Sequence, residues 1–399
     1  MEELLMEKLS DQGRLRPWMG FVLFGVLMAF FILVCAPLQQ NLGIPGLIIT
    51  ELAFLAMAVI YCLITRVKIK EVFPVKKVKV RDIFGCILLI LGAFPVSMIA
   101  VAITGTIFPQ SVSEVGDLNS FLYESMSFPV AALVVALLPA ICEEAIHRGA
   151  ILSNFRSLKH DWVIVLIMGL LFGINHMSVL RFLTTMFLGL ILSYVVVKKN
   201  NILLSMIMHF TNNMISVTVT YLGKSAVSEV SVSNIDYSSL LGTYLIMGIA
   251  SPFIITLGLL LLYPQGHKKI RFLYAGILSA VMLISGIAMT AVTASKNMLV
   301  NSTVSFQIEE ENKDSELVTF DVEKDRSATI VVVVTNAEGD YKIKIDGDKG
   351  SSVIDAEVPD GKLRTLTYNV DLKADHYTVT VVSGSNSKGE HPAFQIVVQ

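Results

Sequence analysis

The sequence is short of charge. Charged residues make up 16% of the 399 residues and hydrophobic residues make up 54%, whereas a typical soluble domain is about 25% charged. So sparse a set of charges would not keep an ordinary cytosolic enzyme dissolved. The chain also has no excess of positive charge, because 31 Lys and Arg stand against 33 Asp and Glu. This balance argues against a nucleic-acid partner.

Cysteine is scarce as well, and its pattern excludes the common cysteine-based metal sites. Four cysteines occur, and none has the Cys-x-x-Cys or Cys/His spacing that is typical of zinc ligands. All four lie in apolar stretches, where we expect them to act as small buried hydrophobic side chains. They are Cys35, Cys62, Cys86 and Cys142.

The charges that are present are unevenly distributed. Residues 298–399 hold 10 Lys and Arg and 18 Asp and Glu, a net charge of −8. Residues 1–297 hold the other 21 and 15, a net charge of +6. This division predicts an apolar transmembrane helical domain at 1–297 and a second, acidic domain at 298–399.

Long apolar runs fill the first domain. A membrane-spanning helix needs about 20 mostly apolar residues, and nine runs of roughly this length occur. We therefore expect a polytopic α-helical membrane protein with about nine transmembrane helices. The expected spans are 17–36, 44–65, 83–108, 126–156, 161–177, 179–197, 200–222, 239–263 and 272–294.

Basic residues in the loops predict the orientation of these spans. With the N-terminus in the cytoplasm, the loops on that side carry 18 Lys and Arg, and the opposite loops carry two. Cytoplasmic loops are enriched in Lys and Arg, so we expect a cytoplasmic N-terminus and a C-terminal domain outside. Eight spans in place of nine would put that domain inside.

The acidic domain has the pattern of short strands. Eight runs rich in Val, Ile, Thr and Tyr are separated by turn sequences, which predicts a C-terminal all-β sandwich, with an immunoglobulin-like arrangement as one option. We expect the domain either to bind an extracytoplasmic partner or to be a passive cap. The expected strands are Val304–Glu310, Leu317–Val322, Ala328–Thr335, Tyr341–Asp346, Val353–Val358, Leu363–Leu372, Tyr377–Val382 and Phe394–Val398.

Ionisable side chains lie inside or next to the predicted spans, where they are costly and mark functional sites by default. On a helix, Glu144 and Arg148 are one turn apart in the order that favours an ion pair. Glu143 points about 100° away and keeps an unpaired carboxylate that can act as a base or acid. The alternative is a solvated helix end. The full set is Glu143, Glu144, His147, Arg148, His176 and His209.

Two of the histidines are candidates for the same site as Glu143. His209 and Asn213 share a helix face and can donate two hydrogen bonds to one oxygen, as an oxyanion hole requires. A turn near 159–160 would place Glu143 and His176 at matching depth, each about 24 Å from that turn. The depth of His209 along its own helix would then differ from theirs by about 10 Å. The alternative is that either histidine only packs between helices.

These residues form three ordered motifs: Glu143-Glu144-x-x-x-Arg148, Phe172-x-x-x-His176 and His209-x-x-x-Asn213. In this, the sequence resembles the CAAX-protease and bacteriocin-processing (CPBP, or abortive-infection) family of intramembrane proteases. The resemblance covers a protease-like core of about residues 126–222. The C-terminal β-domain is an addition to the family pattern.

The resemblance implies an intramembrane endopeptidase that hydrolyses a peptide bond of a membrane-embedded or lipid-linked protein or peptide. We expect a bacterial plasma-membrane enzyme that processes a peptide or confers immunity to one. The resemblance implies that Glu143 activates water with the help of His176, and that His209 and Asn213 hold the oxyanion. Glu144, Arg148 and Phe172 would support the site.

Metal dependence is left open by the resemblance, since family members have been described both as metalloproteases and as metal-independent glutamate proteases. Glu143, His176 and His209 are the candidate ligands if a zinc ion is used. However, no His-Glu-x-x-His pattern occurs, and we favour no cofactor. Pro139 frees a backbone carbonyl one turn before Glu143 and favours a kink that opens a water-filled cavity.

Two other functions fit the same features. A non-catalytic immunity or scaffold protein would keep the fold and bind a peptide, but it predicts the loss of a motif residue, and none is lost. A proton-coupled transporter would also place Glu and His inside the membrane, but it predicts inverted repeats, and none is evident in the sequence. An intramembrane protease therefore leads.

Overall fold

We describe the chain from a computed structural model that covers residues 15–108, 111, 126–223, 237–265, 267–350, 352–358 and 364–399. The chain forms two compact units, Met1–Met289 and Thr290–Gln399, and each is described by itself. The boundary between the two units falls within the last helix of the chain, α15 (Lys268–Asn297).

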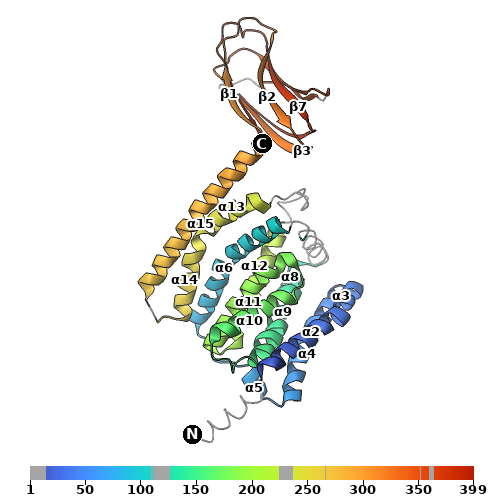
Figure 1. The fold of residues 1–399 in the computed structure, drawn as a ribbon, viewed down its shortest axis with the longest axis vertical. Coiled ribbons are helices and arrows are strands. Elements are labelled where there is room, and N and C mark those ends of the chain that lie inside the picture. Colours follow the sequence, from blue (N-terminus) through green and yellow to red (C-terminus); the bar gives the residue numbers. More distant parts are fainter. Residues whose placement is uncertain are drawn as a thin grey trace. The chain divides into compact units, whose positions relative to one another are not determined.

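The first unit is built of helices (Figure 1). Apolar sequence favours helices here because a helix satisfies its own backbone hydrogen bonds without water. The α-helices before α15 are α2 (Pro17–Phe30), α3 (Ala36–Leu42), α4 (Ile44–Thr65), α5 (Ile69–Val72), α6 (Val80–Ile107), α8 (Phe128–Ala131), α9 (Leu138–Glu144), α10 (Asp161–Asn175), α11 (Val179–Lys199), α12 (Ile202–Gly223), α13 (Tyr237–Met247) and α14 (Ser251–Leu262). Short π or 3₁₀ segments join some of them, namely η1 (Phe31–Cys35), η3 (Ala132–Leu137), η4 (Ala145–Ile151) and η6 (Gly248–Ala250).

Eight helices of the described chain are long and apolar enough to cross a membrane, and the predicted polytopic α-helical body is confirmed. The ninth predicted span, 161–177, is α10, which has 15 residues. At 1.5 Å per residue α10 is about 22 Å long, shorter than the roughly 30 Å hydrocarbon core. The count of nine spans stays a prediction. The eight are Pro17–Leu42, Ile44–Thr65, Val80–Ile107, Phe128–Ile151, Val179–Lys199, Ile202–Leu222, Leu240–Leu262 and Lys268–Thr293.

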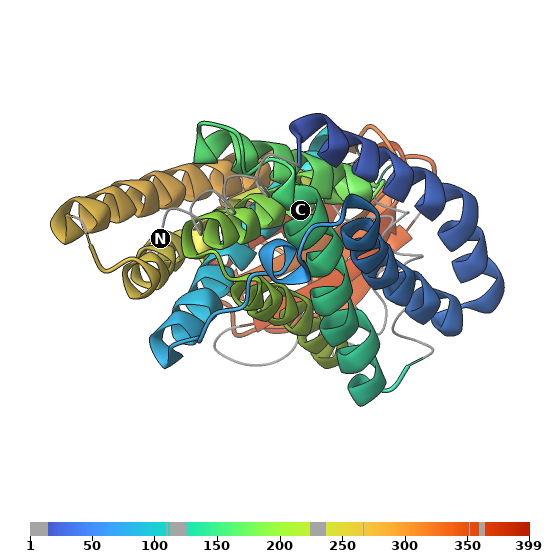
Figure 2. The same cartoon turned by 90° about the horizontal axis from the view of Figure 1, so that it is seen from below.

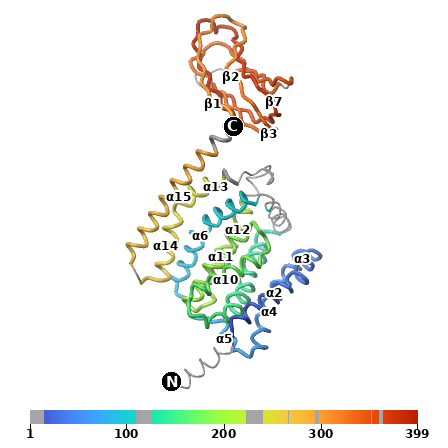
Figure 3. Tube along the Cα trace, in the orientation of Figure 1, coloured from blue at the N-terminus to red at the C-terminus, as the bar shows by residue number. Residues whose placement is uncertain are grey.

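Within this unit the helices lie side by side in an order that follows the chain only in part. Seen from below, α2 and α4 (blue) lie at one edge, α14 and α15 (gold) at the opposite edge, and the green helices α8 to α12 between them (Figure 2). The Cα trace shows the same order (Figure 3). Helix α6 packs against α11, α12, α13 and α14, and so joins the middle of the unit to one edge.

The helix that carries the first motif is irregular. It contains two π-helical segments, η3 before Pro139 and η4 directly after Glu144. Single-turn π segments within α-helices are often found at functional sites. Helical structure ends at residue 153, several residues before the predicted turn at 159–160. Glu143 is therefore about 15 Å from its helix end, not about 24 Å, and this brings it closer to the depth of His209.

The hairpin of α10 and α11 is packed unusually closely. A β-carbon at Gly189 would lie 2.9 Å from Cβ of Phe172 and 3.0 Å from Cα of Gly169. Only glycine allows the two helices to approach this closely. Phe172 of the second motif lies at this contact.

The second unit consists of two four-stranded antiparallel sheets, with strand orders β1-β8-β3-β6 and β2-β7-β4-β5. The strands are β1 (Val300–Ser305), β2 (Asp314–Val322), β3 (Arg326–Thr335), β4 (Tyr341–Gly347), β5 (Ser352–Glu357), β6 (Arg364–Leu372), β7 (Asp375–Ser383) and β8 (Ala393–Val398). Alternate residues point inward, as in β3 and β4, because side chains of a strand alternate between its two faces.

One hydrophobic core lies between these sheets and confirms the predicted β-sandwich. It includes Ile330, Ile343, Tyr377 and Phe394, all fully buried. Strand β1 begins at Val300, four residues before the predicted first strand, and it pairs with β8 from Val300 to Ser305. The prediction placed this strand too late because the polar residues after Val300 lie on an edge strand of the sheet. An immunoglobulin-like arrangement stays a prediction.

Candidate active site

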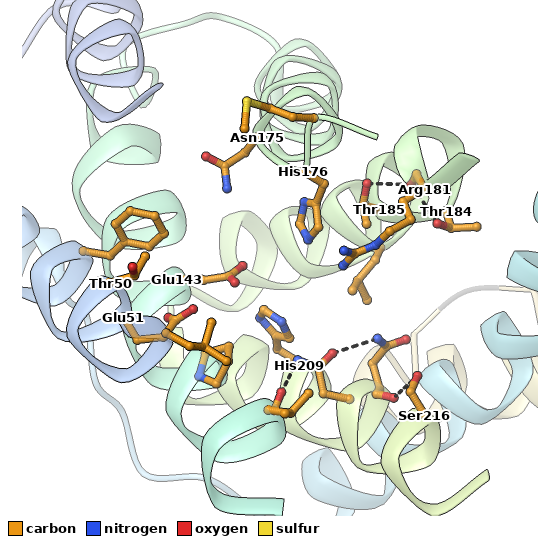
Figure 4. A pocket seen from close by; sticks show the side chains of 18 of the residues that line it. Thr50, Glu51, Glu143, Asn175, His176, Arg181, Thr184, Thr185, His209 and Ser216 are labelled. Atoms are coloured by element: carbon orange, nitrogen blue, oxygen red, sulfur yellow. Dashed lines mark hydrogen bonds between the residues drawn. The ribbon is translucent and has the colours of Figure 1, made fainter. Parts of the chain in front are cut away.

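A cavity of about 570 Å³ opens among the helices of the first unit (Figure 4). Its lining comes from helices that are distant in sequence, including α4, α6, α9, α11 and α12. All four residues predicted to be catalytic line it, namely Glu143, His176, His209 and Asn213. The three motifs therefore converge on one polar cavity inside an apolar helical body.

Glu143 lies on α9 and points into this cavity (Figure 4). Its Oε2 atom is shielded from solvent and has no hydrogen-bond partner among the described residues. Its backbone carbonyl accepts a hydrogen bond from Nδ1 of His147 (2.9 Å). The carboxylate is thus free to interact with a molecule in the cavity, as the sequence predicts.

Glu144 points away from Glu143, and its carboxylate accepts hydrogen bonds from two other side chains. Arg148 Nη1 donates to Glu144 Oε1 (2.7 Å), and both side chains are fully buried. His209 Nδ1 donates to the same carboxylate oxygen (2.9 Å). Arg148 Nη2 also donates to the carbonyl of Gly189 (3.3 Å). The predicted ion pair is confirmed. Glu144 also orients His209, which lies on another helix, α12.

Phe172 is the packing centre of the site. The guanidinium carbon of Arg148 lies 4.2 Å from the centre of its ring, a cation–π arrangement. Three imidazole rings pack against Phe172 edge to face. The centroid distances are 4.8 Å for His176, 5.1 Å for His147 and 5.8 Å for His209. Phe172 therefore fixes the orientation of residues from all three motifs.

His176 occupies the C-terminal end of α10, where the chain turns back toward α11. Met177, the next residue, has a left-handed backbone with φ of 45°, which ends the helix. His176 Nδ1 donates to the carbonyl of Phe172 (2.8 Å), so the proton of the neutral ring is on Nδ1 and Nε2 carries a lone pair. Figure 4 shows the ring directed into the cavity.

Asn213 contacts a backbone carbonyl in the turn that precedes Pro139. Pro139 has no N–H and so cannot donate to any carbonyl of that turn, which includes Val135. Asn213 Nδ2 donates to the carbonyl of Val135 (3.0 Å). An amide nitrogen carries two hydrogens, so one N–H of Asn213 is still available to the cavity.

Glu51 and Arg181 also line the cavity and are not among the site residues predicted from the sequence. Glu51 lies on α4, is 4% exposed, and its Oε2 atom has no hydrogen-bond partner in the described chain. It is near enough to Glu143 to interact with it electrostatically. The sequence does contain an indication of a functional role for Glu51, because it is an isolated carboxylate inside the apolar run 44–65.

The candidate zinc ligands share this cavity. Glu143, His176 and His209 line one cavity, but within the described residues no three His, Cys, Asp or Glu side chains converge on a common point. The four cysteines are buried and free, and Cys35, Cys62, Cys86 and Cys142 pack as small side chains.

Fold and site together define an integral membrane protein with a polar, acid- and histidine-lined cavity between its helices. Residues 125–215 match the family model described as "Rce1-like: Type II CAAX prenyl endopeptidase Rce1-like". That range contains all three motifs, so the resemblance to the CPBP family is confirmed for this core, and the family is one of proteases. A comparison with curated proteins finds no match to the chain.

Proposed function

We propose that this protein hydrolyses a peptide bond of a membrane-associated protein or peptide inside the cavity. The observation that carries the proposal is the unpartnered carboxylate of Glu143 in the same cavity as the free Nε2 of His176. Both groups accept hydrogen bonds, and Oε2 of Glu143 has no hydrogen-bond partner among the described residues. A water molecule between them would donate both of its protons and keep a lone pair for attack.

The reaction then follows from the positions of these groups. The water oxygen bonds to the carbonyl carbon of the substrate while Glu143 takes one of the water's protons. The carbonyl oxygen becomes an oxyanion, and its negative charge is stabilised by nearby donors. When the carbon–nitrogen bond breaks, the leaving amine takes up a proton from a cavity carboxylic acid. The products are a carboxylic acid and an amine.

His209 and Asn213 are our proposed donors to that oxyanion. Asn213 offers its second amide N–H, since its first binds the carbonyl of Val135. His209 uses Nδ1–H for Glu144, so its Nε2 can donate only when the ring is doubly protonated.

Glu51 supplies the second carboxyl group of the mechanism. Its carboxyl group lines the same cavity as Glu143 and interacts with it electrostatically. We propose that Glu143 acts as the base and that Glu51 carries the proton returned to the amine. Figure 4 shows both side chains at the same side of the cavity.

The decisive experiment compares protein termini in membranes from cells that carry the wild type or Glu143→Gln. The substitution keeps the shape of the side chain but removes the base, and general-base catalysis contributes about 10²–10⁴-fold in rate. We expect at least one new terminus in a membrane protein or peptide to disappear. Glu71→Gln, an exposed carboxylate on α5, is the control and should change nothing. If no terminus depends on Glu143, the protease proposal is wrong.

We further propose that hydrolysis needs no metal ion. The geometry supports this, because Glu144 and Arg148 hold His209 in a role that does not require a metal, and Asn213 suits an oxyanion better than a cation. Activity of the purified protein should stay within about twofold in a strong chelator, whereas removal of a catalytic zinc would abolish water activation. A large loss that zinc restores would contradict the proposal.

A further inference from the structure

A second cavity, of about 350 Å³, lies at a different place in the helical unit. It is formed where several helices end, by residues after α4, by α5, by the turn that follows the first-motif helix, and by the end of α11. None of the residues of the proposed active site lines it. It contains Lys70, Arg156, Ser157 and Asn200.

Arg156 is the unusual residue of this cavity. Its Nε and Nη2 atoms are shielded from solvent and have no hydrogen-bond partner in the described part of the chain. Burial lowers the pKa of Arg156, although a guanidinium stays charged in proteins. A shielded charged donor without an acceptor is destabilising. An anion in the cavity would supply acceptors for both atoms.

Among the described residues, no carboxylate is hydrogen-bonded to these two atoms of Arg156. Glu71 also lines the cavity, and its side chain is exposed. Lys70, likewise exposed, adds a second positive group. The charged residues that line the cavity are thus two cations and one carboxylate, and the cavity has room for a small anionic group.

We propose that this cavity binds a phosphate group of a phosphate ester, held by the guanidinium of Arg156 and the ammonium of Lys70. A guanidinium presents paired N–H donors that match two phosphate oxygens, and an ammonium adds a point charge. Basic pockets at the ends of transmembrane helices are suited to lipid headgroups. A soluble phosphate ester has the same chemistry, so the test separates the two sources. The proposal does not depend on the proposed protease activity.

The test uses the full-length protein, purified in an uncharged detergent. Short-chain phosphatidylglycerol, short-chain phosphatidylcholine, glycerol 3-phosphate and inorganic phosphate are titrated separately while thermal unfolding is followed. A ligand that binds only the folded state raises the unfolding temperature. We expect phosphatidylglycerol to stabilise the wild type at lower concentration than phosphatidylcholine, and Arg156→Gln to weaken this binding about tenfold or more.

Two further variants test whether binding depends on the charges of this cavity. Lys70→Gln changes an exposed side chain, so it should fold and bind a few-fold more weakly even if Arg156→Gln is unstable. Lys77→Gln removes the same charge from an exposed position outside the cavity and should bind like the wild type. If glycerol 3-phosphate or inorganic phosphate alone reproduces the Arg156-dependent shift, the site takes soluble phosphate. If both cavity variants respond like Lys77→Gln, the proposal fails.

Discussion

Glu143 and Glu144 are adjacent in sequence and differ completely in their surroundings. A rotation of about 100° per residue directs one into the cavity and the other to Arg148 and His209. The paired carboxylate is structural, because removing one partner of a buried ion pair typically costs about 3–5 kcal/mol. The unpaired carboxylate is the reactive candidate. One step along the helix thus separates the structural carboxylate of Glu144 from the proposed reactive carboxylate of Glu143.

The proposed role of Glu51 can be tested with Glu51→Gln. The amide keeps the volume of the side chain but cannot return a proton to the leaving amine, so hydrolysis should fall about tenfold or more. The change should also alter the dependence of rate on pH, because one of the titrating groups of the mechanism is lost. The measurement is the rate of cleavage of the substrate identified with Glu143→Gln, over a range of pH.

Stability serves as the control for Glu51→Gln. The unfolding temperature should not fall, since the substitution removes an unpartnered buried carboxyl group that contributes no ion pair. A variant that keeps full activity and an unchanged pH profile would rule out Glu51 as the proton donor, while Glu143 would keep its role.

At the scale of elements, the helix that runs from Phe128 to residue 153 is shaped by Pro139 and two π segments. Pro139 has no N–H to donate to the turn before it, and Asn213 of α12 donates to the carbonyl of Val135 in that turn. A side chain of one helix thus binds the backbone of another beside an irregular turn. This contact places the third motif against the first.

Pro139→Ala tests that coupling. Alanine restores an N–H that can donate to the carbonyl of Val135 and compete with Asn213. We expect the unfolding temperature to stay the same or rise, because a proline inside a helix is destabilising. Cleavage should fall about tenfold, because Asn213 loses the contact that positions it.

The matched control for this change is Pro17→Ala. Pro17 stands at the start of α2, directly after the extended residue Arg16, where a missing N–H has no intrahelical partner to lose. Activity and stability should both stay close to the wild type. If Pro139→Ala is equally silent in the cleavage assay, the Val135–Asn213 contact does not position the site.

At the scale of the whole molecule, the chain joins an apolar helical unit to an acidic β-sandwich. The sandwich has its own closed hydrophobic core and contains none of the residues that line the proposed active site. We propose that it acts by binding a partner outside the cytoplasm, while catalysis belongs to the helical unit.

The orientation predicted from the basic loops can be tested directly. If the N-terminus is cytoplasmic and nine segments cross the membrane, a protease added to intact cells should cut within residues 298–399. The same cut should occur in opened cells. Protection in intact cells together with cleavage in opened cells would place the sandwich inside, and would mean that α10 does not cross the membrane.

Much of the fold could be predicted from local sequence. Hydrophobic runs of about 20 residues predict membrane helices, and alternation predicts strands. The depth of Glu143 was predicted less well, because helical structure ends at residue 153 and periodicity does not mark such an end. Glu51 was missed because a lone carboxylate carries no spacing that links it to a distant motif.

The sequence by itself determined the two-part composition, the order of the three motifs, and which of two adjacent carboxylates pairs with Arg148. These follow from residue type and helical periodicity, which are local. Only the tertiary structure decided that Glu51 lies in the same cavity as Glu143, that Phe172 contacts three histidines, and that Asn213 binds the carbonyl of Val135. Those relations depend on packing between segments that are far apart in the chain, which local sequence does not specify.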